Sequence, residues 1–186
     1  SQQLKAIDTT LPKGLLGKLA GTTYCSDGAL SSAAGKSGRD EKGSPSCPAS
    51  SRVGTVNVGA GAGSTPLYVE GAAYLAGPYK GAPLSLAIVT PAVAGPFDLG
   101  TVVVRTKLDV NPENAQIRAV SDEIPQILQG IPLNVRSVAL KMDRPDFTLN
   151  PTSCDPTKIE GSALSVFGQG AALSSPFQVG ECNKLG

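Results

Sequence analysis

The sequence contains no histidine among its 186 residues. Histidine is the commonest general acid/base in enzymes and the commonest metal-binding side chain, so its absence removes the usual serine–histidine hydrolases and most transition-metal sites. No G-x-S-x-G nucleophile motif is present. A glycosidase would need two carboxylates that face each other across a sugar, and the spacing of the acidic residues does not indicate such a pair. We therefore predict no catalytic residues and no enzymatic activity.

Basic patches, aromatic residues and long apolar runs are also scarce. The net charge is +1, aromatic residues make up 4% of the chain, and tryptophan is absent. Nucleic-acid binding therefore lacks both a basic surface and stacking side chains. No apolar run is long enough to span a membrane. The start of the sequence, SQQLKAIDTTLPKG, lacks the apolar segment of a signal peptide, so we expect any targeting segment to lie elsewhere.

No cofactor is predicted. The glycine run at 59–63 resembles a phosphate-binding loop, but it leads into a strand-like sequence instead of a helix. Among metals, only structural calcium has oxygen-rich segments available, at 122–124 and 143–146, and neither matches an EF-hand.

Four cysteines are present, in two pairs near the two ends of the chain: Cys25 with Cys47, and Cys154 with Cys182. Four cysteines allow three connectivities, and the local spacing favours pairing within each end. A zinc site would need cysteines much closer together in sequence. Because the reducing cytosol does not maintain such disulfides, we expect an extracellular or cell-surface location.

The fold class follows from short β-branched runs separated by many glycines and prolines. This pattern predicts a single all-β domain over 1–186: an antiparallel β-sandwich or a partly closed barrel of about eight to ten short strands, with two disulfides. At most one or two helical turns are expected, one of them at 123–131. Residues 26–46, rich in serine, glycine and charge, are predicted to form an exposed loop closed by the first disulfide.

Two strand predictions are more specific. Residues 84–90 are almost continuously apolar, which indicates a strand covered on both faces. Residues 100–110 alternate and should pair with 115–122 across an NPEN turn. Val102, Val104 and Leu108 are then expected in the buried core, with Arg105 and Lys107 on the more exposed face.

Three tyrosines lie close together in the sequence: Tyr68, Tyr74 and Tyr79. We consider them candidate contacts for a sugar or a peptide, because an aromatic face packs well against such ligands. The alternative is that they pack at one end of the domain.

Several long stretches resemble a known module: LPKGLLGKLAG, SRVGTVNVGAGAGSTPLYVEGAAYLAGPYKG, ILQGIPLNVRSVALKMDRPDFTLNPTSCDP and SSPFQVGEC. The module is a β-rich repeat of large secreted or cell-surface proteins of actinobacteria and related bacteria, and the resemblance covers nearly the whole chain. It implies a tandem extracellular module with one cysteine pair near each end, and it carries no catalytic residues with it.

Two functions are therefore expected. The first is a non-enzymatic structural or adhesive module whose partners are neighbouring modules of a longer chain. The alternative is a module that binds cell-wall or extracellular glycan. An extracellular protein is a further candidate partner, and nucleic acid is not.

Overall fold

The computed structural model describes residues 3–181, and about half of them lie in β-strands. The elements in chain order are β1 (Leu4–Thr10), β2 (Leu16–Gly17), α1 (Asp27–Gly35), α2 (Gly38–Gly43), a 3-10 turn (Ala49–Ser51), β3 (Arg52–Ala60), β4 (Leu67–Ala76), β5 (Leu84–Ala94), β6 (Phe97–Val110), β7 (Ile117–Ser121), β8 (Ile127–Leu128), β9 (Ile131–Pro132), β10 (Ser137–Lys141), β11 (Thr148–Leu149), β12 (Thr157–Ser165) and β13 (Gly170–Phe177).

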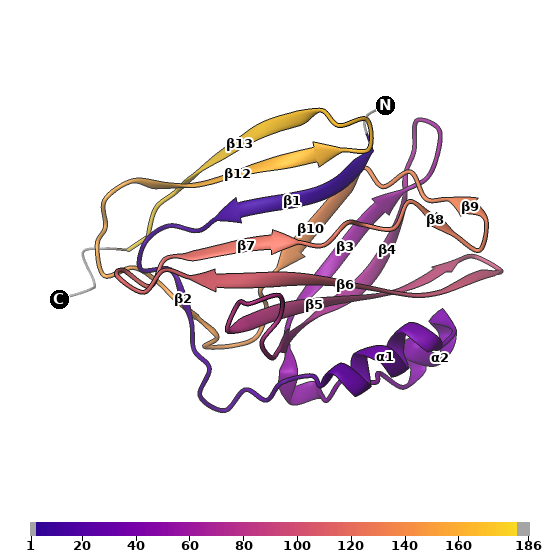
Figure 1. Ribbon diagram of the computed structural model, residues 1–186, viewed down its shortest axis with the longest axis horizontal. Coiled ribbons are helices and arrows are strands. Elements are labelled where there is room, and N and C mark those ends of the chain that lie inside the picture. Colours follow the sequence, from indigo (N-terminus) through magenta and orange to yellow (C-terminus); the bar gives the residue numbers. More distant parts are fainter. Residues whose placement is uncertain (1–2, 182–186) are drawn as a thin grey trace.

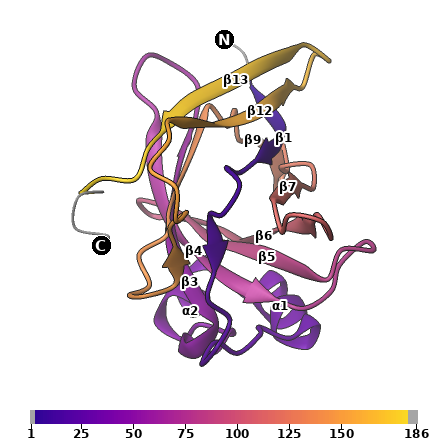
Figure 2. The ribbon, with the colours of Figure 1, turned by 90° about the vertical axis from the view of Figure 1, so that its left-hand side faces the viewer.

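One antiparallel sheet organises the fold. Its nine strands follow the order β10-β3-β4-β5-β6-β7-β1-β12-β13, and the sheet curls into a half-barrel (Figures 1 and 2). We call the cavity on its concave side the lumen. Two short ladders, β2 with β11 and β8 with β9, lie outside this order. The prediction of a mostly antiparallel β fold is confirmed, but two helices accompany the sheet where at most one or two helical turns were expected. The nine strands do not form a sandwich, because they belong to one sheet.

The predicted β6–β7 hairpin is confirmed, with Val110 opposite Ile117 and Thr106 opposite Ser121. The turn between the strands is stabilised by Asn111, whose side-chain oxygen accepts a hydrogen bond from the Glu113 backbone amide at 2.8 Å. Asparagine is typical of such turns, and the NPEN sequence therefore indicated the turn correctly.

The exposed-loop interpretation of residues 26–46 is wrong, because this segment forms both helices. Ser26 caps α1 by accepting a hydrogen bond from the Ala29 amide at 3.2 Å, and Ser37 caps α2 in the same way through Asp40 at 3.1 Å. Both helices lie outside the curled sheet, against its convex face (Figure 2). Leu30 of α1 is buried there.

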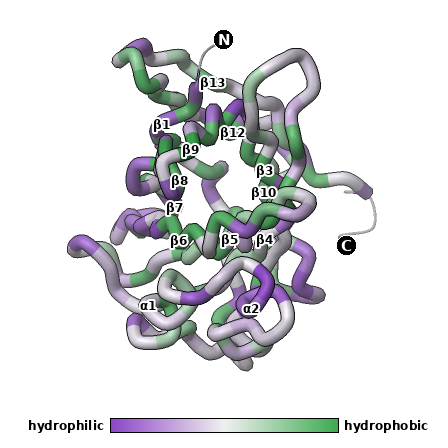
Figure 3. The backbone as a smooth tube through the Cα atoms, turned by 90° about the vertical axis from the view of Figure 1, so that its right-hand side faces the viewer, coloured by the Kyte–Doolittle hydropathy of each residue, from purple (hydrophilic) through white to green (hydrophobic). Residues whose placement is uncertain are grey.

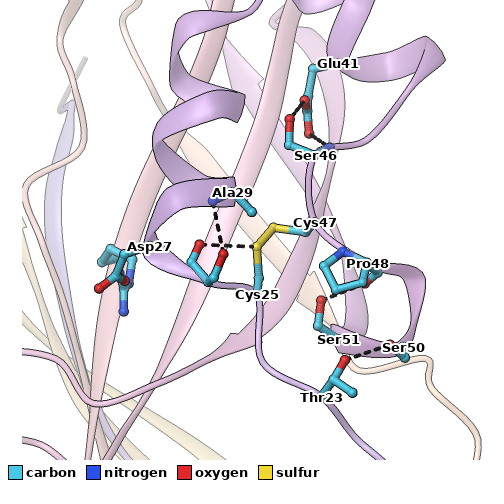
Figure 4. The surroundings of a disulfide bond; sticks show 12 residues. Thr23, Cys25, Asp27, Ala29, Glu41, Ser46, Cys47, Pro48, Ser50 and Ser51 are labelled. Carbon is cyan, nitrogen blue, oxygen red and sulfur yellow. Dashed lines mark hydrogen bonds and ion pairs between the residues drawn. A yellow bond between two sulfur atoms is a disulfide. The ribbon is translucent and has the colours of Figure 1, made fainter.

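The first disulfide is confirmed. Cys25 and Cys47 are bonded and buried between the helical segment and the sheet (Figure 4). The predicted partner of Cys154, Cys182, lies outside the described residues, so that pairing stays a prediction.

A buried carboxylate completes the turn that leads from α2 to Cys47. Glu41 accepts hydrogen bonds from the backbone amide of Ser46 at 2.8 Å and from its hydroxyl at 2.6 Å (Figure 4). Lys36 lies 3.3 Å from the same carboxylate. Because a buried charge is costly without partners, these contacts explain how this charged sequence can pack against the sheet.

β5 is fully covered on one face only, which corrects the prediction that both of its faces are covered. On the convex face Ala87 and Val89 belong to the cluster that packs against Cys25 and Leu30. On the concave face Leu86 and Ile88 point into the lumen.

The predicted faces of β6 need correction. Arg105, expected on the more exposed face, is only 12% exposed because α1 covers it. Its guanidinium donates to Asp27 at 2.8 Å and to the Ser85 hydroxyl at 2.7 Å. Val102, Val104 and Leu108, expected in the buried core, are half-buried and line the lumen.

The helical turn expected at 123–131 does not form. Residues 127–132 instead make a small hairpin of β8 and β9. Gln129 and Gly130 connect its strands with positive φ angles of 47° and 79°. This is the conformation that a two-residue hairpin turn requires, and it explains the glycine. None of the helices within residues 3–181 is both long and apolar enough to cross a membrane.

Leu75 and Leu108 both lie on the concave face of the sheet and line the lumen, but they differ in how tightly they are packed. Leu75 is 1% exposed and packs with Val56 and Phe147, whereas Leu108 is half-buried. We expect Leu75→Ala to lower the free energy of unfolding by about 2–5 kcal/mol, because it opens a cavity in packed surroundings. Leu108→Ala should cost about 1 kcal/mol, because little packing is lost. Urea unfolding measures both values, and equal costs would contradict an open lumen.

Asp98 joins α2 to the sheet and gives stability a pH dependence. Its carboxylate accepts hydrogen bonds from the backbone amides of Gly38, Arg39 and Gly100 at 2.7–2.9 Å. These bonds hold the pKa of Asp98 below its ordinary value of about 3.8. The stabilisation is therefore complete above the unfolded-state pKa and disappears as the pH falls through the lower folded-state pKa.

We therefore expect Asp98→Asn to be less stable than the wild type at pH 7. The difference should begin to shrink below about pH 3.8, where the carboxylate of the unfolded wild type becomes protonated, and should disappear as the pH falls through the lower pKa of the folded state. Urea unfolding of both proteins between pH 7 and pH 2 measures this difference, and a difference that stays constant over the range would refute the role of Asp98.

Candidate functional site

The lumen of the half-barrel contains an apolar cavity of about 870 Å³. Among the described residues that line it, none carries a charge, and Phe147 is the single aromatic residue. The polar side chains are five hydroxyls, from Thr9, Thr90, Thr106, Ser121 and Thr148. A cavity of this size falls within the range of small-molecule sites, and its lining favours an apolar occupant over water.

The cavity lining comes from the alternation of the strands. Residues of β6 that point inward, from Val102 to Val110, follow the cavity over roughly 27 Å at the rise of an extended strand. Inward residues of β3, β4, β5 and β7 add further aliphatic side chains. Figure 3 shows the hydrophobic segments of these strands around the lumen. The cavity is therefore elongated and aliphatic.

One sector of the lumen is packed. Val56, Leu75 and Phe147 form a buried cluster on the concave face. The ring of Phe147 lies against Gly17 of β2, where a Cβ atom would come within 3.2 Å of the ring. Glycine at this position therefore lets the ring approach the backbone closely. The remaining concave face has no such cluster among the described residues, and its side chains border the cavity.

A strap of residues 122–136 crosses one end of the lumen. It leaves β7, and the Ile124 amide donates to the carbonyl of Lys5 in β1 at 2.8 Å. At the other side the Gly61 amide, after β3, donates to the carbonyl of Leu133 at 2.8 Å. Leu128 and Ile131 of the β8–β9 hairpin line the cavity from this strap. The sequence did not indicate the strap, because the residues that form hydrogen bonds with it are distant in the chain.

The three tyrosines do not form one patch. Tyr68 is exposed, and Tyr74 is buried beneath the helices on the same face of β4, roughly 20 Å along the strand. Tyr79 lies beyond the end of β4, where its ring packs under the guanidinium of Arg105, 4.3 Å from its centre. The hydroxyl of Tyr79 donates to Asp122, which raises the pKa of this tyrosine.

The segments considered for calcium engage other partners. Asp122 binds Tyr79 and Lys80, and Asp143 accepts a hydrogen bond from Thr55. Within residues 3–181, no group of three or more acidic or cysteine side chains is arranged to hold a metal ion.

Comparisons of the chain with protein-family models, with curated proteins and with solved structures find no match. The similarity to the bacterial repeat module therefore stays a prediction. The lumen is the feature from which a function can be argued.

Proposed function

We propose that this chain is a non-enzymatic extracellular module that binds an extended apolar molecule, such as a lipid acyl chain, in the lumen of the half-barrel. The observation that carries the proposal is the uncharged aliphatic cavity of about 870 Å³. Its walls leave many half-buried aliphatic side chains, which gain free energy when an apolar ligand covers them.

The chemistry of the lining selects the ligand class. The lining residues within the described range offer hydroxyls but no charged group that could pair with a charged ligand. A charged headgroup would lose hydration without compensation there, so it should remain at an open end. An acyl chain fits a site with an apolar interior and an open end, because its apolar tail can lie along the strands while its polar group stays in water.

The disulfide supports the location. Cys25 and Cys47 form a buried bond, which is typical of proteins from oxidising compartments. An extracellular module that carries or holds a lipid chain is consistent with this chemistry.

A structural role in a row of modules is the second candidate. The strands β10 and β13 form the two edges of the sheet, and no described strand pairs with their outer sides. Residues 170–176 of β13 are exposed. Open edges can accept a strand from a neighbouring module, so this candidate predicts association through β10 or β13. The glycan alternative has less support, because Tyr68, Tyr74 and Tyr79 lie apart.

The binding test uses a fluorescent fatty acid in solution, with a matched pair of substitutions. Ala119 lines the lumen, and Ala139 lies on the outer side of β10, where it is exposed. We expect Ala119→Phe to weaken binding on the order of tenfold or more, because the ring occupies the cavity. Ala139→Phe should leave binding unchanged.

A chain-length series sharpens the same test. Saturated fatty acids of increasing length, used as competitors, should bind on the order of tenfold more tightly for every two added methylenes until the cavity is full. Absence of probe binding by the wild type, or equal affinity for short and long chains, would refute a lumen site for acyl chains.

A further inference from the structure

The turns at the strap end of the half-barrel differ in charge from the connections at the opposite end. Because the nine strands are antiparallel, the turns at 61–66, 95–96 and 166–169 lie at the same end of the sheet as the strap. The β8–β9 turn at 129–130 lies there too, with the side chain of Gln129 next to Gly100 near the start of β6. None of these four turns contains a charged residue.

The opposite end carries charge in its connections. Lys80 lies in the β4–β5 turn, and Glu113 lies in the β6–β7 turn. The segment that joins β10 to β11 adds Asp143, Arg144 and Asp146. The two ends of one half-barrel therefore present different chemistry to their surroundings.

Large apolar side chains are exposed at the strap end. They come from all four turns or the strand residues that flank them: Leu67, Tyr68, Phe97, Ile127, Ile131 and Phe167. Phe97 and Phe167 are 65% and 72% exposed. Single exposed apolar residues are normal on protein surfaces, but a set gathered at turns without charged residues marks an interaction site.

This end is also continuous with the cavity. Leu67 and Ile131 belong both to the exposed set and to the cavity lining. An apolar path therefore runs from the tips of the turns into the lumen. Asp98, next to Phe97, does not interrupt this path, because three backbone amides bind its carboxylate.

We infer that the strap end docks on a lipid surface with uncharged or zwitterionic headgroups, and that acyl chains enter the lumen there. The inference rests on the proposed acyl-chain site and adds the partner and the entrance. Aliphatic and aromatic side chains insert at the boundary between headgroups and acyl chains, and their binding scales with the apolar area that they bury. The turns contain no basic residue that an anionic membrane would attract. The Arg39 guanidinium, which donates to the Pro96 carbonyl at 2.7 Å, belongs to a residue that also binds the Asp98 carboxylate, so a surface without net charge is the matching partner.

The test is flotation of the whole chain with phosphatidylcholine vesicles. We compare the wild type with the double variant Phe97→Ser, Phe167→Ser, whose side chains do not line the cavity. Tyr24→Ser with Leu149→Ser is the control, since these residues are also large, apolar and exposed, at 47% and 46%, but lie outside the strap-end turns. Unfolding midpoints and binding of the fluorescent fatty acid in solution are measured for all three proteins.

We expect the wild type and the control to bind vesicles with similar affinity. The strap-end variant should bind at least about tenfold more weakly while it keeps its solution affinity for the fatty acid. Vesicle binding should change little between about 0.05 and 0.5 M salt, because no charge pair contributes.

Three results would overturn the docking inference. The wild type could bind the fatty acid in solution but not the vesicles, which would leave the proposed function standing without the membrane partner. The strap-end variant could bind vesicles as well as the wild type does. Sedimentation could instead show that the strap end joins two copies of this chain, with a dimer that the same variant abolishes. Loss of fatty-acid binding by the wild type would refute the proposed function itself.

Discussion

The disulfide between Cys25 and Cys47 holds the helical segment against the convex face of the sheet. A curled sheet has two faces, and each needs cover for the apolar side chains that alternate along its strands. Here α1 and α2 supply the cover on the convex face, next to β5 and β6. In the described chain no second sheet or helix fills the concave face, which leaves the lumen open and apolar. The cavity and the proposed function both depend on this asymmetry.

The sheet could be predicted from sequence to a useful extent. The alternation in residues 100–110 and the asparagine turn that follows are local signals, and they located the β6–β7 hairpin. The same alternation does not indicate whether each face of the strand packs against another element, borders a cavity or faces solvent. Val104 alternates in the same way whether it enters a sealed core or borders a cavity. Arg105 appears exposed by type, yet α1 covers it and Asp27 pairs with it.

The two helices and the strap could not be predicted from local sequence patterns. Ser26 and Ser37 are recognisable helix caps, but the glycine-rich and charged composition of this segment outweighed them. The segment can pack against the sheet because the Ser46 amide donates a hydrogen bond to the carboxylate of Glu41. This bond forms only when the chain turns from α2 towards Cys47. The strap depends on hydrogen bonds to β1 and β3, far away in the sequence. The proposed site was therefore absent from the sequence interpretation, and the tyrosines that it favoured lie apart.

The most direct measurement of an acyl chain in the lumen is by nuclear magnetic resonance, with the protein labelled at its methyl groups and a long-chain fatty acid bound. The proposal predicts short-range magnetisation transfer from the methylenes of the ligand to the methyls of Val102, Val104 and Leu108, which line the concave face. The methyls of Val103, which packs against the convex-face cluster, should receive none. Contacts restricted to Val103 and its convex neighbours, or no contacts with the three lumen residues, would contradict the proposal.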